Sequence, residues 1–369
     1  MLILHKNVKK ITLFIIMIFP LIFTGCTSGK KTESDKSNAF DIKAAANVTE
    51  SYMNAVAKGN IDNISQFYSK KLSKSPANSE NQNLKIFGYN IAETNEVGSA
   101  GLFKIMVSRS DLSKVFTSLD QYDVRISKED NDYKVVDTKD SIEKEAFEQD
   151  GEIRLRSKNN ANTNLVINFE GLPSYAFSKD DKANINKILV PKKFSLISFS
   201  YGGDSLAIST YDKNSFLGIV KIDETLAVQS SNGGDNNEQG GQGGGGQESQ
   251  GQTKIKEKPI GKEVFPLDML KDAKVEFMSF SPTEKFITAQ YSTVNESKSL
   301  RVYKADSGDM IPFKFEDKYP IDKVNVLFSS YDKDNLNFDV VPKSANDKSV
   351  SNYIGKWQLD LKNFKEVKM

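Results

Sequence analysis

The spacing of apolar residues divides the chain into segments with different predicted structures. Between residues 39 and 72, apolar side chains recur every three or four positions, which is the period of an amphipathic helix. The two helical faces carry Val48, Tyr52, Ala55 and Val56, and then Ile64, Phe67, Tyr68 and Leu72. Gly59 separates the two stretches and is a typical helix end. The pattern predicts two short helices.

The period falls to two after residue 100. The alternating apolar residues are Phe103, Ile105 and Val107, followed by Tyr122, Val124 and Ile126. Such alternation predicts strands with one buried face. Residues 39–145 are therefore expected to form an α+β domain in which two helices lie on a curved antiparallel sheet.

The last hairpin of this region, residues 122–137 (YDVRISKEDNDYKVVD), resembles the end of nuclear-transport-factor-2-like domains. The resemblance implies a cone whose mouth could hold a small molecule. The candidate lining residues are Tyr52, Tyr68, Tyr89, Tyr133 and Asp137. The alternative, which we favour, is that these tyrosines belong to the core and keep their hydroxyls near the surface.

A repeated pattern fills residues 150–369. A strand, a turn and a second strand recur in residues 194–210, 275–289 and 324–338, each followed by a further strand pair. Phe280 and Phe328 lie 48 residues apart at equivalent positions, and a four-stranded unit of this length is typical of propeller blades. The segments resemble blades of TolB-type and WD-type propellers. With a partial blade that starts near residue 151, we expect an all-β, propeller-like domain of about four blades.

Residues 230–254 interrupt the first of these repeats. The segment is rich in Gly and Gln and has almost no apolar side chains. Because it cannot bury enough surface to offset its ordering entropy, we expect a disordered linker.

The first 25 residues have the pattern of an export signal. Lys6, Lys9 and Lys10 precede an apolar run over residues 11–23. The sequence Phe23-Thr24-Gly25-Cys26 resembles the lipobox of bacterial lipoproteins. The resemblance implies cleavage between Gly25 and Cys26, acylation of Cys26 and a cell-membrane anchor on the extracytoplasmic face. Residues 26–38 then form a lipidated, polar tether.

Composition limits the chemistry of the mature chain. Removing three leader lysines from 50 basic residues leaves 47 against 49 acidic ones, so the chain is no polycation and we expect no nucleic-acid partner. The one histidine is His5, in the leader, and the one cysteine is Cys26. We therefore expect no catalytic imidazole or thiolate, no cofactor and no tightly held transition metal. Asp332, Asp334 and Asp339 miss the spacing of an EF-hand loop and read as solvated turn residues.

These observations favour a membrane-anchored, non-enzymatic module that binds or scaffolds a protein or a glycan. The alternative is an enzyme built on the cone that uses a carboxylate and a tyrosine. A strongly raised pKa on an acid in a pocket would favour this alternative. A weaker possibility is a solute-capture lipoprotein that serves a transporter.

The lipobox generates the first testable prediction. Replacing Cys26 by Ser removes the thiol that would be acylated, so the Cys26→Ser chain should accumulate as unprocessed precursor or be shed from the membrane. Metabolic labelling with an alkyne fatty acid measures this, since only the wild-type chain should become labelled. An unlabelled wild-type chain would contradict the assignment.

Overall fold

The computed structural model describes residues 40–59, 61–74, 83–227, 257–345 and 347–369. The predicted leader, Cys26, the tether and the 230–254 linker lie outside the described residues. Asp41–Met369 forms one compact unit. Among the described residues, no helix has both the length and the apolar composition needed to cross a membrane.

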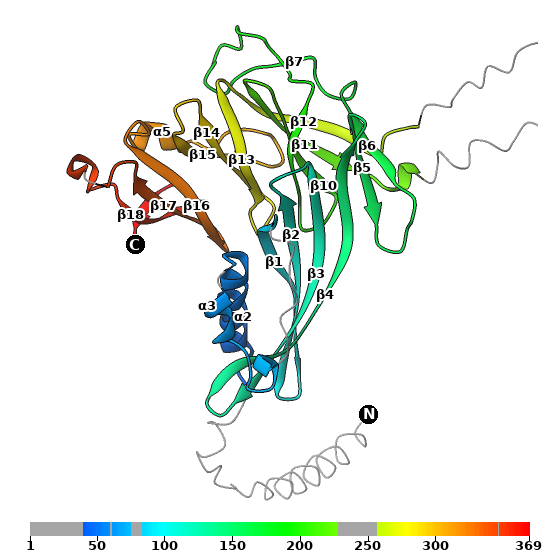
Figure 1. Ribbon diagram of the computed structural model, residues 1–369, viewed down its shortest axis with the longest axis vertical. Helices are drawn as coiled ribbons and strands as arrows, with labels where there is room; N and C mark the ends of the chain where they lie inside the picture. Colours follow the sequence, from blue (N-terminus) through cyan, green and yellow to red (C-terminus); the bar gives the residue numbers. More distant parts are fainter. Residues whose placement is uncertain (1–39, 60, 75–82, 228–256, 346) are drawn as a thin grey trace, which may run out of the picture. The chain divides into compact units, whose positions relative to one another are not determined.

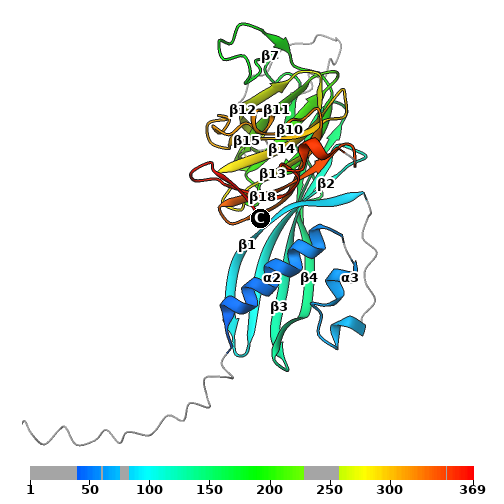
Figure 2. The same ribbon diagram turned by 90° about the vertical axis from the view of Figure 1, so that its left-hand side faces the viewer.

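Helix α2 (Ile42–Ala57) opens the compact unit. The side chain of Asp41 caps its first turn by accepting from the backbone amides of Lys43 and Ala44. Its buried face carries Ala45, Thr49, Tyr52 and Met53. This face packs on the sheet formed by β1 to β4, as Figures 1 and 2 show. Helix α3 (Ile61–Ser65) and the 3-10 turn η3 (Leu72–Lys74) follow.

Six antiparallel strands form one continuous sheet in the order of the chain. They are β1 (Leu84–Val97), β2 (Ala100–Asp111), β3 (Phe116–Glu129), β4 (Asp132–Gln149), β5 (Glu152–Ser157) and β6 (Asn164–Asn168). The expected strands near residues 103, 122 and 133 lie in β2, β3 and β4. Strand β1 was not predicted.

The predicted fold class of an α+β domain followed by an all-β domain is wrong. Strands hold about 54% of the structure and helices about 11%, so no separate helix-on-sheet domain is formed. The sheet also continues past residue 145, because Lys144 to Gln149 of β4 pair with β5. Because β4 is hydrogen-bonded to β3 on one side and to β5 on the other, the sheet is continuous across residue 145. The predicted domain ended at residue 145 because the residues after the 122–137 hairpin are mostly charged and show no clear apolar alternation.

Three further sheets have the antiparallel meander of propeller blades, and the propeller-like character of this all-β part is confirmed. The first sheet is formed by β9 (Phe194–Phe199), β10 (Ser205–Tyr211), β11 (Ser215–Ile222) and β12 (Gly261–Leu270). The second contains β13 (Ala273–Phe280), β14 (Phe286–Thr293) and β15 (Lys298–Lys304). The third contains β16 (Val324–Asp332), β17 (Asn335–Pro342), β18 (Gly355–Asp360) and β19 (Glu366–Lys368). The shorter elements are β7 (Tyr175–Ala176), β8 (Ile188–Leu189), α5 (Phe315–Lys318) and η5 (Lys348–Val350).

Three apolar cores lie between successive sheets. The first core joins the six-stranded sheet to the first blade, with Leu155 and Ile208 as fully buried examples. The second joins the first and second blades and also takes in Phe87 of β1. The third joins the second and third blades around Phe338. Each sheet is therefore stabilised by burying a face against the next one.

A buried ionic network ties the second blade to its surroundings. The guanidinium of Arg301 on β15 lies 2.7 Å from Asp268 of β12, 2.7 Å from Asp180 and 3.0 Å from Glu316 of α5. The Tyr303 hydroxyl also donates to Asp268, at 2.7 Å. The side chain of Arg301 is 7% exposed and that of Asp268 is fully buried. Each charge is thus paired with several partners, as burial of charge requires.

Replacing Arg301 by Met should leave Asp268 and Glu316 buried without their main cationic partner. We expect the free energy of unfolding to fall by about 3–5 kcal/mol. The matched control is Lys362→Met, which removes an exposed, solvent-screened ion pair to Asp334 and should leave the free energy of unfolding nearly unchanged. Chemical denaturation measures both values, and equal losses in the two variants would contradict the role of the network.

Candidate functional site

A cleft of about 620 Å³ is lined by residues of α2, β1 and the β16–β17 hairpin, together with a few residues of the first two blades. Its volume is typical of small-molecule sites. The cleft is lined by Glu50, Ser51, Asn54, Lys58, Phe87, Gly88, Tyr89, Asn90, Tyr201, Phe277, Phe328, Ser329, Ser330, Tyr331, Asp332, Lys333 and Asn337, together with Ala57, Ile86, Ile91 and Pro282. Residues far apart in the sequence therefore share one site because the third blade lies beside α2 and β1.

Strand irregularities occur on three strands around the cleft. Pairing shifts at Phe87 in β1, at Glu276 in β13 and at Ser329 in β16. Each shift adds one residue to a strand and re-aims the neighbouring side chains, a device that is common beside functional sites. In β16 the amide of Phe328 donates to the Gln290 side chain at 2.9 Å, which fixes the irregular segment to the second blade.

Four aromatic rings follow one another along the cleft, and we call Phe87, Phe277, Phe328 and Tyr331 the aromatic ladder. The centroids of Phe87 and Phe277 lie 4.6 Å apart, those of Phe277 and Phe328 4.5 Å, and those of Phe328 and Tyr331 5.4 Å. Phe87 is buried, whereas the other three rings are half-buried. The ladder therefore packs rings from three different sheets against one another at the cleft.

Two carboxyl groups lie at the mouth of the cleft. Glu50 comes from the exposed face of α2, and Asp332 begins the turn between β16 and β17, in which Lys333 has a positive φ of 46°. Partial burial, and then the negative charge of Asp332, raise the pKa of the Glu50 carboxyl. Glu50 therefore keeps its proton to a higher pH than an ordinary glutamate does.

Two tyrosines of the cleft lining, Tyr89 and Tyr201, make hydrogen bonds through their hydroxyl groups. Tyr89 donates to the backbone oxygen of Glu50 at 3.2 Å and to the side-chain oxygen of Asn54 at 3.1 Å. Burial, followed by the charge of Glu50, raises the pKa of Tyr89, so its proton stays in place at physiological pH. Tyr201 donates to the backbone oxygen of Phe280 at 2.8 Å. These bonds hold α2, β1 and the first two blades around the site.

Of the residues predicted to line a cone, Tyr52 and Tyr68 contact each other, whereas Tyr89, Tyr133 and Asp137 lie elsewhere. Tyr89 alone among them lines the cleft. The ring of Tyr52 packs on Phe67 and Tyr68 beneath α2, as expected of core residues. The Tyr133 hydroxyl accepts from the backbone amide of Asp41 at 2.6 Å. Asp137 is exposed on β4.

The sequence reading missed most of the cleft. Glu50 lies on the exposed face of α2, whereas the apolar residues that predicted this helix lie on its other face. Phe277 and Phe328 were assigned to strands without a role, and Asp332 was read as a solvated turn residue. Within the described residues there is no group of three acidic, histidine or cysteine side chains placed to hold a metal ion. The sequence YDKDN (residues 331–335) could have indicated part of the cleft, since it places an acid beside an aromatic ring at the tip of the β16–β17 hairpin.

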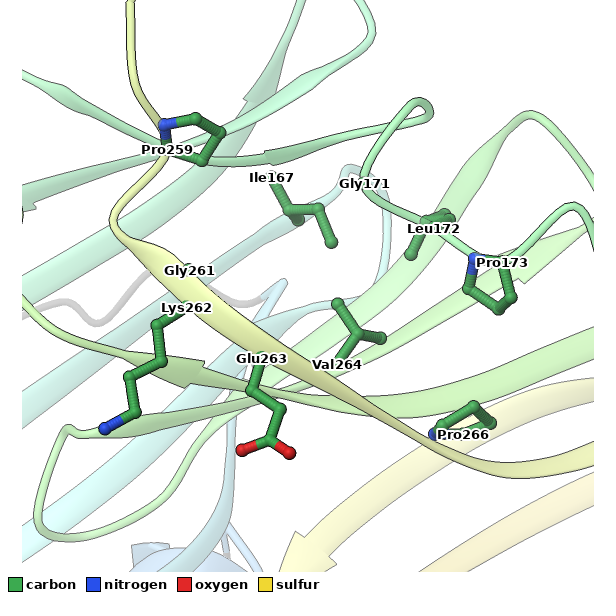
Figure 3. Close-up of a pocket in the computed structure, with 10 residues that line it drawn as sticks. All are labelled: Ile167, Gly171, Leu172, Pro173, Pro259, Gly261, Lys262, Glu263, Val264 and Pro266. Carbon is green, nitrogen blue, oxygen red and sulfur yellow. The ribbon is translucent and has the colours of Figure 1, made fainter.

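A second, shallower pocket of about 410 Å³ lies between β12 and the segment after β6. Figure 3 shows that apolar residues such as Ile167, Leu172 and Val264 form its wall. Lys262 and Glu263 are the ionisable residues among its lining, and the figure shows both side chains pointing away from that wall. This pocket lacks the facing acids and stacked rings of the cleft.

No family model and no curated protein sequence matches the chain. Solved structures with a similar arrangement include a prolyl endopeptidase, with 8% identity and a TM-score of 0.28 over 88% of this chain and 38% of that one. Prolyl oligopeptidase B from Galerina marginata has 9% identity and a TM-score of 0.24 over 78% of this chain and 42% of that one. TolB from Acinetobacter baumannii has 10% identity and a TM-score of 0.18 over 57% of this chain and 58% of that one. The chain thus spans less than half the length of these two peptidases.

The solved structures that resemble the chain are mostly peptidases, and this finding corrects the prediction of a non-enzymatic binding or scaffold module. The prediction rested on the missing imidazole and thiolate, and it gave too little weight to carboxyl groups. TM-scores of this size lie well below those of chains that share one fold, so they do not transfer a peptidase activity. Any activity must be argued from the cleft itself.

Proposed function

We propose that the cleft binds a small polar organic substrate and hydrolyses it by carboxyl acid–base chemistry. The observation that carries this proposal is the raised pKa of Glu50 beside the negative charge of Asp332, at the mouth of an aromatic-lined cleft. Acids with shifted pKa values in clefts are typical of catalytic groups.

The two carboxyl groups divide the work. Glu50, which holds its proton longer, donates that proton to the oxygen that leaves the substrate. Asp332 supplies the negative charge that activates a water molecule or stabilises the positive charge of the transition state. The only histidine of the sequence is His5, so proton transfer at the cleft falls to carboxyl, phenol and ammonium groups. The protonated form of Glu50 is lost as the pH rises through its pKa, and the rate falls with it.

The proposed location is the extracytoplasmic face of the cell membrane. The lipobox that ends in Gly25-Cys26 supports it, with acylated Cys26 as the membrane partner and residues 26–38 as a tether to α2. The near-neutral charge of the mature chain supports a substrate other than nucleic acid. The cleft would then meet substrates outside the cytoplasm.

Replacing Glu50 by Gln removes the transferable proton but keeps the size of the side chain. With 4-nitrophenyl glycosides, esters and phosphates as probes, we expect kcat/KM on the accepted probe to fall by about 100-fold or more. Asp332→Asn should cause a loss of similar size.

The matched control for these variants is Glu96→Gln, an exposed glutamate of β1 that does not line the cleft, and it should retain the wild-type rate. Wild-type turnover that persists in both Glu50→Gln and Asp332→Asn would contradict the proposal, as would the absence of turnover on every probe.

A further inference from the structure

The β7–β8 ribbon, which we define as residues 175–189, carries an apolar pair on its outer side. Tyr175 pairs with Leu189, and Ala176 pairs with Ile188. Ala176 belongs to the first core and Ile188 packs against it. Because successive side chains of a strand point to opposite sides, Tyr175 and Leu189 share the side that faces away from this core. Tyr175 is 43% exposed and Leu189 is 79% exposed.

Exposed apolar side chains are concentrated in this ribbon. Ile185, in the connection between the two strands, is 75% exposed. Among the residues that the structure describes, nine large apolar side chains are exposed; three of the nine lie in the ribbon, and Leu189 and Ile185 are the two most exposed of all. Single exposed apolar residues are normal on protein surfaces, whereas a group of them marks a contact with a partner or a membrane.

Positive charge accompanies these apolar side chains. Residues 171–193 contain five lysines and two aspartates, which gives a formal charge of +3. The carboxylate of Asp180 is already paired with Arg301 and Lys314. The ammonium group of Lys187 lies 4.4 Å from the centre of the Tyr175 ring, so one positive charge sits directly beside the apolar pair. The exposed lysines of the segment are Lys182, Lys187, Lys192 and Lys193.

The composition of this surface distinguishes a membrane from a protein partner. The buried centres of protein interfaces are depleted of lysine. Segments that lie in the interfacial region of a bilayer combine aliphatic and aromatic side chains with lysines, whose ammonium groups attract anionic headgroups. Tyrosine favours the same region, because its ring is apolar and its hydroxyl is polar. The β7–β8 ribbon has this combination, and residues 171–193 contain no arginine.

We infer that the β7–β8 ribbon is a membrane-contact surface: Leu189 and Ile185 enter the headgroup region of an anionic bilayer, and the neighbouring lysines bind its phosphate groups. The inference depends neither on the chemistry proposed for the cleft nor on acylation of Cys26. Beside an acyl anchor, the ribbon adds a second point of attachment, which restricts how the compact unit is oriented on the membrane.

Sedimentation with lipid vesicles tests this contact. The chain that begins at Thr27 lacks Cys26 and contains the whole compact unit Asp41–Met369. It is mixed with vesicles made of equal parts of phosphatidylglycerol and phosphatidylcholine, or of phosphatidylcholine alone. We expect the chain to prefer the anionic vesicles. The double variants Ile185→Gln/Leu189→Gln and Lys182→Gln/Lys187→Gln should each bind them about tenfold more weakly.

Each double variant has a matched control. Val294→Gln/Val367→Gln removes two valines that are 70% and 64% exposed outside the ribbon. Lys71→Gln/Lys348→Gln removes two exposed lysines elsewhere on the surface. Both controls should bind the anionic vesicles as the wild type does. All the substituted side chains are exposed, so the variants are expected to fold normally.

Tryptophan fluorescence gives a second readout, which reports insertion at the ribbon itself. The emission of Leu189→Trp should move to shorter wavelength on anionic vesicles, whereas that of Val294→Trp should not. Trp357, the only tryptophan of the sequence, contributes equally to both variants. No binding at millimolar anionic lipid, an equal loss of binding in the control variants, or binding without an emission shift in Leu189→Trp would overturn the inference.

Discussion

Backbone pairing along β4 is the constraint on which the rest of the structure depends. This strand pairs with β3 over most of its length and with β5 at its end, so the part that carries α2 and the part that leads into the blades belong to one sheet. The first core then fixes this sheet to the first blade, and Ser110 adds a buried hydrogen bond of 2.7 Å to the backbone of Ile197. Since each blade packs on the previous one, the position of β4 determines where the third blade meets α2.

The cleft is a consequence of this arrangement and not of a local motif. Its acids come from a helix near the start of the described chain and from a hairpin near its end, while its rings come from β1, β13 and β16. Gly88 shows how close this approach is, because an added Cβ would clash with the hydroxyl of Tyr201. A site assembled from several elements is held rigidly when each element is buried elsewhere, as the three cores provide here.

Local pattern predicted the elements better than their assembly. Helix α2 and the strands over residues 194–210, 275–289 and 324–338 follow from local sequence patterns, and β11 and β12 form the further strand pair expected after the first of these segments. The two-residue alternation of buried and exposed side chains is interrupted at Phe87 and Ser329, because the extra residue of each β-bulge reverses which face the following side chains occupy. Glu50 could not be recognised as a site residue, since its raised pKa depends on Asp332, which is 282 positions away in the sequence. Long-range placement of this kind leaves no trace in a single sequence.

The most direct test of the central claim is the titration of the Glu50 carboxyl by carbon-13 NMR, with the resonance assigned by its loss in Glu50→Gln. We predict that Glu50 titrates at a higher pH than a glutamate in an unstructured peptide. Its pKa should fall in Asp332→Asn, because the neighbouring charge is removed, and should stay partly raised, because the burial remains. A Glu50 that titrates like a glutamate in an unstructured peptide and does not respond to Asp332→Asn would contradict the carboxyl pair.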